Sequence, residues 1–306
     1  MRRFYLAALI LLACTIYSSA QTKTVAERLG YPADSKLLII HADDLAVSHS
    51  EDVASFDALD RGAATSASIM VPCPWLTEVA DYAKAHPDAD LGLHLTLTSE
   101  WKTYRWGPVT DISKVPSLLD PSGYLWPETE PAVQHIKAED VERELRAQTQ
   151  RAYSMGIHPT HVDSHMGVLF ARPDLTAAYV KLAHEYKLPF LATLGPQAPP
   201  NVKALFTDKD IMVDTVVFAS PDVQAAGWQD FYLNLVKNLK PGLTELIVHL
   251  AHDDAEMQAV TVDHPDYGSA WRQRDYNVIT SPEFKKALED NHIILVHWSD
   301  LKKLIQ

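Results

Sequence analysis

The stretch Leu37-Leu38-Ile39-Ile40-His41-Ala42-Asp43-Asp44 decides the fold class of this protein. A short apolar run that ends in charged residues is typical of a buried strand in a parallel sheet, whose carboxyl end carries polar groups. Outward from this stretch, short apolar runs alternate with amphipathic segments along the chain. The expected strands are 37–41, 65–71, 91–95, 160–163, 188–192, 214–218, 243–249 and 292–297. The expected helices are 50–60, 74–85, 139–155, 173–186, 228–239 and 282–289.

This alternation predicts an α/β protein in which helices cover a parallel sheet. Seven or eight strand–helix units favour a barrel, and an open doubly wound sheet is the alternative. No repeat, low-complexity tract or linker interrupts residues 30–306. We therefore expect a single domain over residues 21–306.

The composition excludes several classes of protein. Of 306 residues, 47% are hydrophobic and 22% are charged, which is typical of a folded globular chain and not of a disordered one. A formal charge of −13 argues against binding to nucleic acids or to anionic membrane surfaces. Two cysteines are too few for a disulfide framework.

The first twenty residues have the pattern of a secretory signal peptide. Arg2 and Arg3 precede an apolar run of 14 residues, and small residues lead to a cleavage site after Ala20. The run is shorter than the roughly 20 residues that span a bilayer, so no membrane span is expected. We expect an exported protein, periplasmic or extracellular. The alternative is a lipoprotein anchored at Cys14.

Aspartate and histidine side chains follow the apolar runs of four expected strands. Because the carboxyl ends of parallel strands lie at one edge of the sheet, these side chains should meet there. The groups in question are Asp43, Asp44, His94, the segment His161-Val162-Asp163-Ser164-His165, and His249. Burial of so many ionisable groups is costly unless they pair or bind a metal.

One carboxylate and two imidazoles suit a divalent ion and leave coordination positions open for water. A second carboxylate beside the ion can accept a proton from the activated water, and a histidine can protonate the leaving group. These residue types together indicate metal-assisted hydrolysis of an amide or an ester.

Several segments of the chain, taken together, resemble the YdjC-like carbohydrate deacetylases, which include chitooligosaccharide deacetylases and hopanoid-associated relatives. The segments are 37–44, Thr65-Ser66-Ala67-Ser68-Ile69-Met70-Val71, Gly92-Leu93-His94-Leu95-Thr96-Leu97-Thr98, 115–118 with Gly123, 161–165, 244–249, and Arg272 and Asp275 before Ser281-Pro282. The resemblance implies a distorted, incomplete (β/α) barrel related to polysaccharide deacetylases. It also implies hydrolysis of the N-acetyl group of a 2-acetamido sugar or oligosaccharide.

The resemblance further implies roles for individual residues. Asp44, His94 and His161 are expected to hold one divalent ion, magnesium or zinc. Asp43 is then the general base and His249 the general acid. Strand alternation, which places His161 and Asp163 on one face, favours His161 as the third ligand, but the sequence does not decide between His161 and His165.

The remaining expected site residues face the substrate, an N-acetylated saccharide. They are His165, Asp163, Arg272, Trp101 and Trp106. The tryptophans belong to an aromatic loop after His94 that could stack on sugar rings, or could instead anchor the loop in a small core of its own.

The chain departs from its relatives at three points. His41 stands where many relatives have asparagine, and Met166-Gly167 follows His165 where many have further histidines. Most characterised members are cytoplasmic, whereas this chain has the pattern of an export signal. Two other functions remain open: a carbohydrate O-acetyl esterase with the same site, and a sugar-binding module without turnover. The sequence also leaves open the sugar and the oligomeric state.

Overall fold

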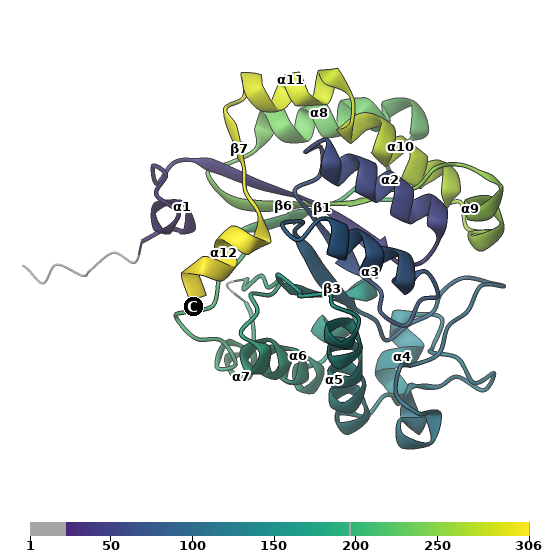
Figure 1. The fold of residues 1–306 in the computed structure, drawn as a ribbon. Helices are drawn as coiled ribbons and strands as arrows, with labels where there is room; N and C mark the ends of the chain where they lie inside the picture. Colours follow the sequence, from purple (N-terminus) through teal and green to yellow (C-terminus); the bar gives the residue numbers. More distant parts are fainter. Residues whose placement is uncertain (1–22, 196, 306) are drawn as a thin grey trace, which may run out of the picture.

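The computed structural model describes residues 23–305 except Pro196, and the expected signal peptide lies outside these residues. The described strands form one sheet in which neighbouring strands pair in parallel (Figure 1). The strands are β1 (Lys36–Leu45), β2 (Ser66–Ile69), β3 (Leu91–Leu95), β4 (Val162–Ser164), β5 (Thr215–Val217), β6 (Gly242–His249) and β7 (Ile293–Leu295). Their order is β4-β3-β2-β1-β6-β5, and β7 pairs with the start of β1.

Helices surround the sheet on its outer side, with α2, α8, α10 and α11 on one flank and α5 and α6 on the other (Figure 1). The helices are α1 (Val25–Arg28), α2 (His49–Asp60), α3 (Leu76–Ala85), α4 (Thr129–His135), α5 (Ala138–Ser154), α6 (Pro173–Tyr186), α7 (Pro200–Lys203), α8 (Trp228–Asn238), α9 (Ala255–Val260), α10 (Ser269–Ile279), α11 (Pro282–Asp290) and α12 (Trp298–Ile305). In the part of the chain that the structure describes, none of these helices has the length and apolarity to cross a bilayer.

The sheet curls until its two edges are joined through a short extended segment at 190–192. The amide of Leu191 donates to the carbonyl of Val162 in β4 (3.0 Å), and the amide of Val213 donates to the carbonyl of Ala192 (3.0 Å). The amide of Asp214 in turn donates to the carbonyl of Leu243 in β6 (2.9 Å). The carbonyl of Pro189, directly before this segment, also accepts from the amide of Val162 (3.1 Å). These few bonds close the sheet only at one level, which confirms the expected distorted, incomplete barrel. The segment expected as strand 188–192 serves as this bridge.

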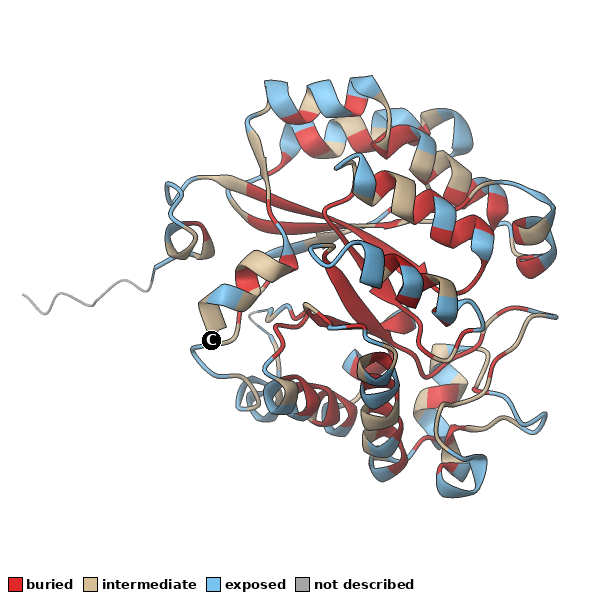
Figure 2. Ribbon diagram, viewed as in Figure 1, coloured by how far each residue is buried: buried red, intermediate tan, exposed pale blue. Residues whose placement is uncertain are grey.

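Strand β1 supplies residues to two hydrophobic cores, as its alternating faces require. Leu38 and Ile40 belong to the larger core between sheet and helices, whereas Leu37 and Ile39 belong to a smaller core inside the barrel with Trp298. Figure 2 shows the central strands buried and the outer helix faces exposed. His41 and Asp43 continue the inner face of β1, so the barrel interior becomes polar toward the carboxyl ends of the strands.

Candidate metal centre and active-site cavity

Two adjacent aspartates at the end of β1 line the same cavity, which has a volume of about 930 Å³. In a regular strand Asp43 and Asp44 would point to opposite faces. Here the pairing of β1 with β2 shifts register between Ala42 and Leu45, and Asp44 adopts a positive φ of 74°. This irregularity turns both carboxylates toward the cavity, a role that β-bulges often have beside active sites.

Asp44, His94 and His165 form a buried group whose ligand atoms lie within 4.8 Å of one another. The Oδ1 atom of Asp44 is 3.3 Å from Nε2 of His94 and 3.3 Å from Nδ1 of His165. Within the described residues this Oδ1 atom is buried and has no hydrogen-bond partner. An unpartnered carboxylate oxygen between two imidazole nitrogens fits a bound divalent cation.

Each histidine of this group has a carboxylate behind it. Asp163 Oδ1 lies 2.6 Å from Nδ1 of His94, and Glu100 Oε2 lies 3.0 Å from Nε2 of His165. Histidines that bind metals usually donate their second ring N–H to such a group, which fixes the tautomer and the ring orientation. The other nitrogen of each ring is thereby left free on the side of Asp44.

Asp43 and His249 face each other across the same spot. Nε2 of His249 lies 3.9 Å from Oδ2 of Asp43 and 4.0 Å from Oδ2 of Asp44. Pairing of Asp43 with His249 in the β1–β6 ladder sets this approach. Burial lowers the pKa of His249 to about 4, so its ring is neutral at pH 7. A carboxylate and a neutral imidazole in this position can exchange a proton with a substrate.

Arg272 on α10 is buried and binds two carboxylates. Its Nη2 donates to Oδ2 of Asp44 at 2.8 Å, its Nη1 donates to Glu51, and its guanidinium lies 5.5 Å from the ring centre of Trp101. Burial alone would raise the pKa of Asp44, but the charge of Arg272 and the neighbouring histidines hold it well below its ordinary value. Arg272 also lines the cavity. Its hydrogen bond fixes the position of one oxygen of Asp44.

The family model described as YdjC-like protein matches residues 37–290. The chain belongs to the YdjC-like family. This confirms the resemblance that the sequence motifs indicated.

Relatives of this YdjC-like protein span nearly its whole length. A carbohydrate deacetylase of Thermus thermophilus is 34% identical over 275 residues, covering 87% of this chain and 94% of the relative. A chitooligosaccharide deacetylase of Yersinia enterocolitica is 26% identical over 273 residues, covering 87% and 99%. A crystal structure from Enterococcus faecalis, described as a candidate cellobiose-phosphate cleavage protein, matches with a TM-score of 0.72 at 25% identity, covering 87% and 99%.

His161, expected as the third ligand, lies apart from Asp44 and His94 in this YdjC-like protein. It stacks on Trp298 inside the barrel, with ring centres 5.0 Å apart, and shares a separate group with His41 and Asp163. It is not among the described residues that line the cavity, whereas His165 is. In the structure, His165 and not His161 lies beside Asp44 and His94.

This placement has a simple cause. His161 precedes β4, whereas His165 follows its last residue, Ser164. His165 therefore lies toward the carboxyl ends of the strands, where the other site residues lie, and His161 lies deeper in the barrel. A correct assignment of the end of the strand would have favoured His165 from sequence.

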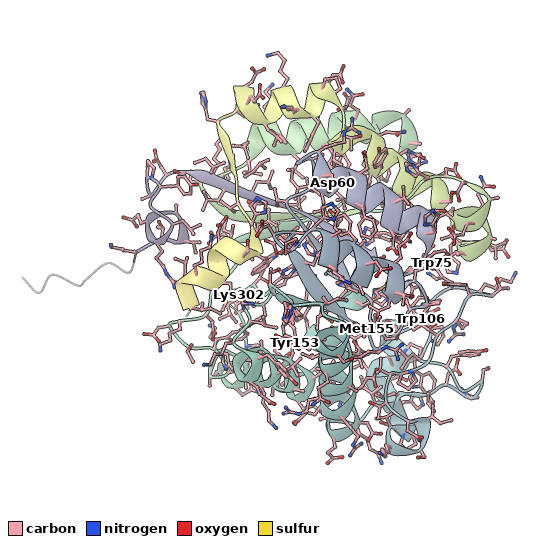
Figure 3. The ribbon with its side chains drawn as sticks, in the orientation of Figure 1. Asp60, Trp75, Trp106, Tyr153, Met155 and Lys302 are labelled. Carbon is pink, nitrogen blue, oxygen red and sulfur yellow. The ribbon has the colours of Figure 1, made fainter. Side chains whose placement is uncertain are left out.

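Of the two expected tryptophans, the structure brings only Trp101 to the cavity. Trp106, labelled in Figure 3, is buried, and its Nε1 donates to the carbonyl of Thr98 (2.8 Å), so it anchors the loop after β3. Asp163, expected near the substrate, lies instead behind His94.

Sequence reasoning missed Glu100 and Glu51. Glu100 lies just after β3, six positions beyond His94, where no motif marks a carboxylate as functional. Glu51 looks like an ordinary acidic residue in the first turn of α2. Only the tertiary contacts with His165 and Arg272 distinguish them.

Proposed function

We propose that this protein is a metal-dependent carbohydrate deacetylase that hydrolyses the N-acetyl group of a saccharide. The observation that carries the proposal is the group of Asp44, His94 and His165, with a carboxylate behind each histidine and Asp43 beside it. The deacetylase names of relatives that match 87% of the chain support the same reaction.

Asp44, His94 and His165 would hold one divalent ion. Two imidazoles in the donor set favour zinc over magnesium, which prefers oxygen ligands. When bound, the ion polarises the amide carbonyl and lowers the pKa of a water molecule.

The protein's own side chains would move the protons. Asp43 lies at the edge of the ligand group, with Oδ2 3.7 Å from Nε2 of His94, and takes the proton from the attacking water. His249, whose Nε2 lies 3.9 Å from the same oxygen, would take up the proton that Asp43 has accepted and pass it to the leaving nitrogen. Acetate and a free amine are the products.

The charges around the cavity indicate an uncharged saccharide. Among the described residues that line it, Arg272 is the only lysine or arginine, and it is bound to Asp44 and Glu51. Three further carboxylates besides Asp43 and Asp44 line the cavity: Glu100, Glu128 and Asp266. A sugar phosphate would meet repulsion here, whereas a neutral sugar can donate its hydroxyls to these oxygens. Trp101 offers an apolar face for a sugar ring.

We also propose that the enzyme acts outside the cytoplasm, on the basis of the N-terminal segment that ends at Ala20. Fractionation of the producing cell, with N-terminal sequencing of the mature chain, tests this. A mature chain that begins near Gln21 in an exported fraction supports export, whereas one that begins at Met1 in the cytoplasm contradicts it.

Acetate release tests the reaction itself. The purified protein is incubated with N-acetylglucosamine oligomers, their 6-phosphates and O-acetylated sugars, with and without a chelator. We expect chelator-sensitive acetate from the neutral N-acetyl sugars. Acetate from the O-acetyl sugars alone would change the reaction to ester hydrolysis, and metal binding without any acetate would favour a sugar-binding module.

A further inference from the structure

The most unusual residue below the metal-ligand group is His41 on the inner face of β1. It is fully buried, and the β1–β2 register places it opposite Ser66. The hydroxyl of Ser66 lies 2.8 Å from Nδ1, and the hydroxyl of Ser68 lies 3.0 Å from Nε2. Two hydroxyls on one neighbouring strand thus fix the orientation of the ring.

The Nε2 atom of this ring touches two carboxylates with different tasks. It lies 2.9 Å from Oδ2 of Asp163 and 3.2 Å from Oδ1 of Asp43. The other oxygen of Asp163 lies 2.6 Å from His94. One imidazole therefore connects the proposed base to the carboxylate that orients a proposed metal ligand.

We propose that His41 is a positioning residue that holds Asp43 and Asp163 in fixed relation, so that the base and the His94 side of the metal site keep one geometry. This inference rests on the proposed function. It concerns position 41, where many proteins that this chain resembles have asparagine. The planar ring of His41 spans the distance from Ser66 to both carboxylates. The amide of an asparagine at position 41 is shorter and cannot contact Ser66, Asp43 and Asp163 together.

Charge supports the same arrangement. Burial alone would lower the pKa of His41, but its bonds with Asp163 and Asp43 raise it to about 10. The ring is therefore a cation between two buried carboxylates, with a third, Glu245, 3.8 Å from Nδ1. Without this cation, Asp43 and Asp163 would repel each other in the barrel interior.

His161 supplies a matched control. It is equally buried in the barrel interior, and its ring centre lies 5.0 Å from that of His41. Its hydrogen-bond partner is the hydroxyl of Thr160, however, and not a carboxylate of the site. Replacement of either histidine disturbs the same interior, but only His41 contacts Asp43 and Asp163 directly.

The experiment compares His41→Asn with His161→Gln in the full chain. Zn²⁺ affinity of the metal-free protein is measured by calorimetry without substrate, and kcat and KM are measured for acetate release. For His41→Asn we expect about tenfold weaker Zn²⁺ binding and a kcat at least about tenfold lower, with KM within about twofold. His161→Gln should change Zn²⁺ affinity and kcat by less than about twofold.

A double variant distinguishes coupling from general damage. If His41 acts on the metal through Asp163, Zn²⁺ binding in His41→Asn/Asp163→Asn should equal that in Asp163→Asn alone. Multiplied losses, or His41→Asn with wild-type Zn²⁺ affinity and kcat, would overturn the proposal. If His41→Asn does not fold, Ser66→Ala replaces it, because this change removes the hydroxyl beside Nδ1 of His41. Zn²⁺ affinity and kcat should then both fall, by less than in His41→Asn. Unchanged Zn²⁺ affinity and kcat in Ser66→Ala would overturn the proposal.

The proposed function can fail separately. A wild-type protein that releases no acetate from any saccharide would refute the deacetylase proposal. Weakened Zn²⁺ binding in His41→Asn would then still support the positioning role of His41.

Discussion

Asp43 and Asp44 are neighbours in sequence, yet their oxygens have different partners. One oxygen of Asp44 accepts from Arg272, and the other faces His94 and His165. The oxygens of Asp43 face His41 on one side and His249 on the other. These partners agree with the proposed roles, in which Asp44 is a metal ligand and Asp43 exchanges protons.

This difference predicts the effect of Asp43→Asn. An amide cannot accept the proton from water, so kcat for acetate release should fall by about 10²- to 10⁴-fold. Zn²⁺ affinity measured by calorimetry should change little, because Asp43 lies beside the ligand group. Asp44→Asn is the comparison and should lose the metal. Unchanged turnover in Asp43→Asn would refute its role as the base.

Glu100 allows a test that needs no substrate. Its contact with Nε2 of His165 orients Nδ1 toward Asp44, so Glu100→Gln should weaken Zn²⁺ binding by about tenfold. The control is Glu128→Gln. Glu128 lines the same cavity but belongs to none of the described groups that could hold a metal. Equal Zn²⁺ affinities of the two variants would exclude a positioning role for Glu100.

At the scale of the element, two local features of the strands build the interior. The irregularity in β1 turns Asp43 and Asp44 to one side. In β3, Gly92 lies two residues before His94, and its missing side chain leaves room for the ring of His161. A Cβ atom at position 92 would lie 2.3 Å from Nε2 of that ring, closer than any van der Waals contact.

Gly92→Ala should therefore destabilise the fold by about 1–3 kcal/mol, because the ring of His161 is held against Trp298 and has little room to move. Urea unfolding measures the loss. The double variant Gly92→Ala/His161→Ala should be more stable than the sum of the single changes predicts, since the clash is gone. Additive losses would show that the ring does not meet the new methyl group.

At the scale of the whole molecule, the barrel has a polar layer between the active site and its closed end. Glu245 on β6 belongs to this layer with His41. The Nε1 atom of Trp298 donates to Oε1 of Glu245 at 3.2 Å. Within the described part of the chain, Oε2 of Glu245 has no hydrogen-bond partner. Burial raises the pKa of Glu245 to about 7, although the charge of His41 opposes the shift.

This raised pKa predicts a pH dependence of stability. Between its ordinary pKa of 4.5 and about 7, the folded protein keeps a proton on Glu245 that the unfolded chain has released. The contribution to the free energy of unfolding is therefore complete below pH 4.5 and falls, by up to about 3 kcal/mol, as the pH rises to 7. Glu245→Gln, which keeps the acceptor for Trp298, should lack this decline. Urea unfolding from about pH 4 to pH 8 checks it, and parallel curves for both proteins would contradict it.

The sequence alone predicts the parallel α/β barrel, because apolar runs of strand length alternate with amphipathic segments, and burial requires that pattern in any such fold. The sequence analysis did not predict helices α1, α4, α7, α9, α10 and α12, nor the bridging role of 190–192. The bridge depends on hydrogen bonds between distant segments, which no hydrophobic period marks. The same rule that places strand ends at one rim predicted Asp43, Asp44, His94 and His249 as neighbours.

Tertiary structure decided what strand alternation cannot express. It brought His165 and not His161 beside Asp44 and His94, because His165 lies beyond the end of β4 and His161 lies before it. It placed Asp43 and Asp44 on one side through a register shift that no local pattern marks. It assigned Glu100 and Asp163 to the histidines they orient, since carboxylates acquire such tasks only from partners far away in sequence. The sequence by itself thus determined which residue types meet at the rim, and three-dimensional packing determined which atoms face one another.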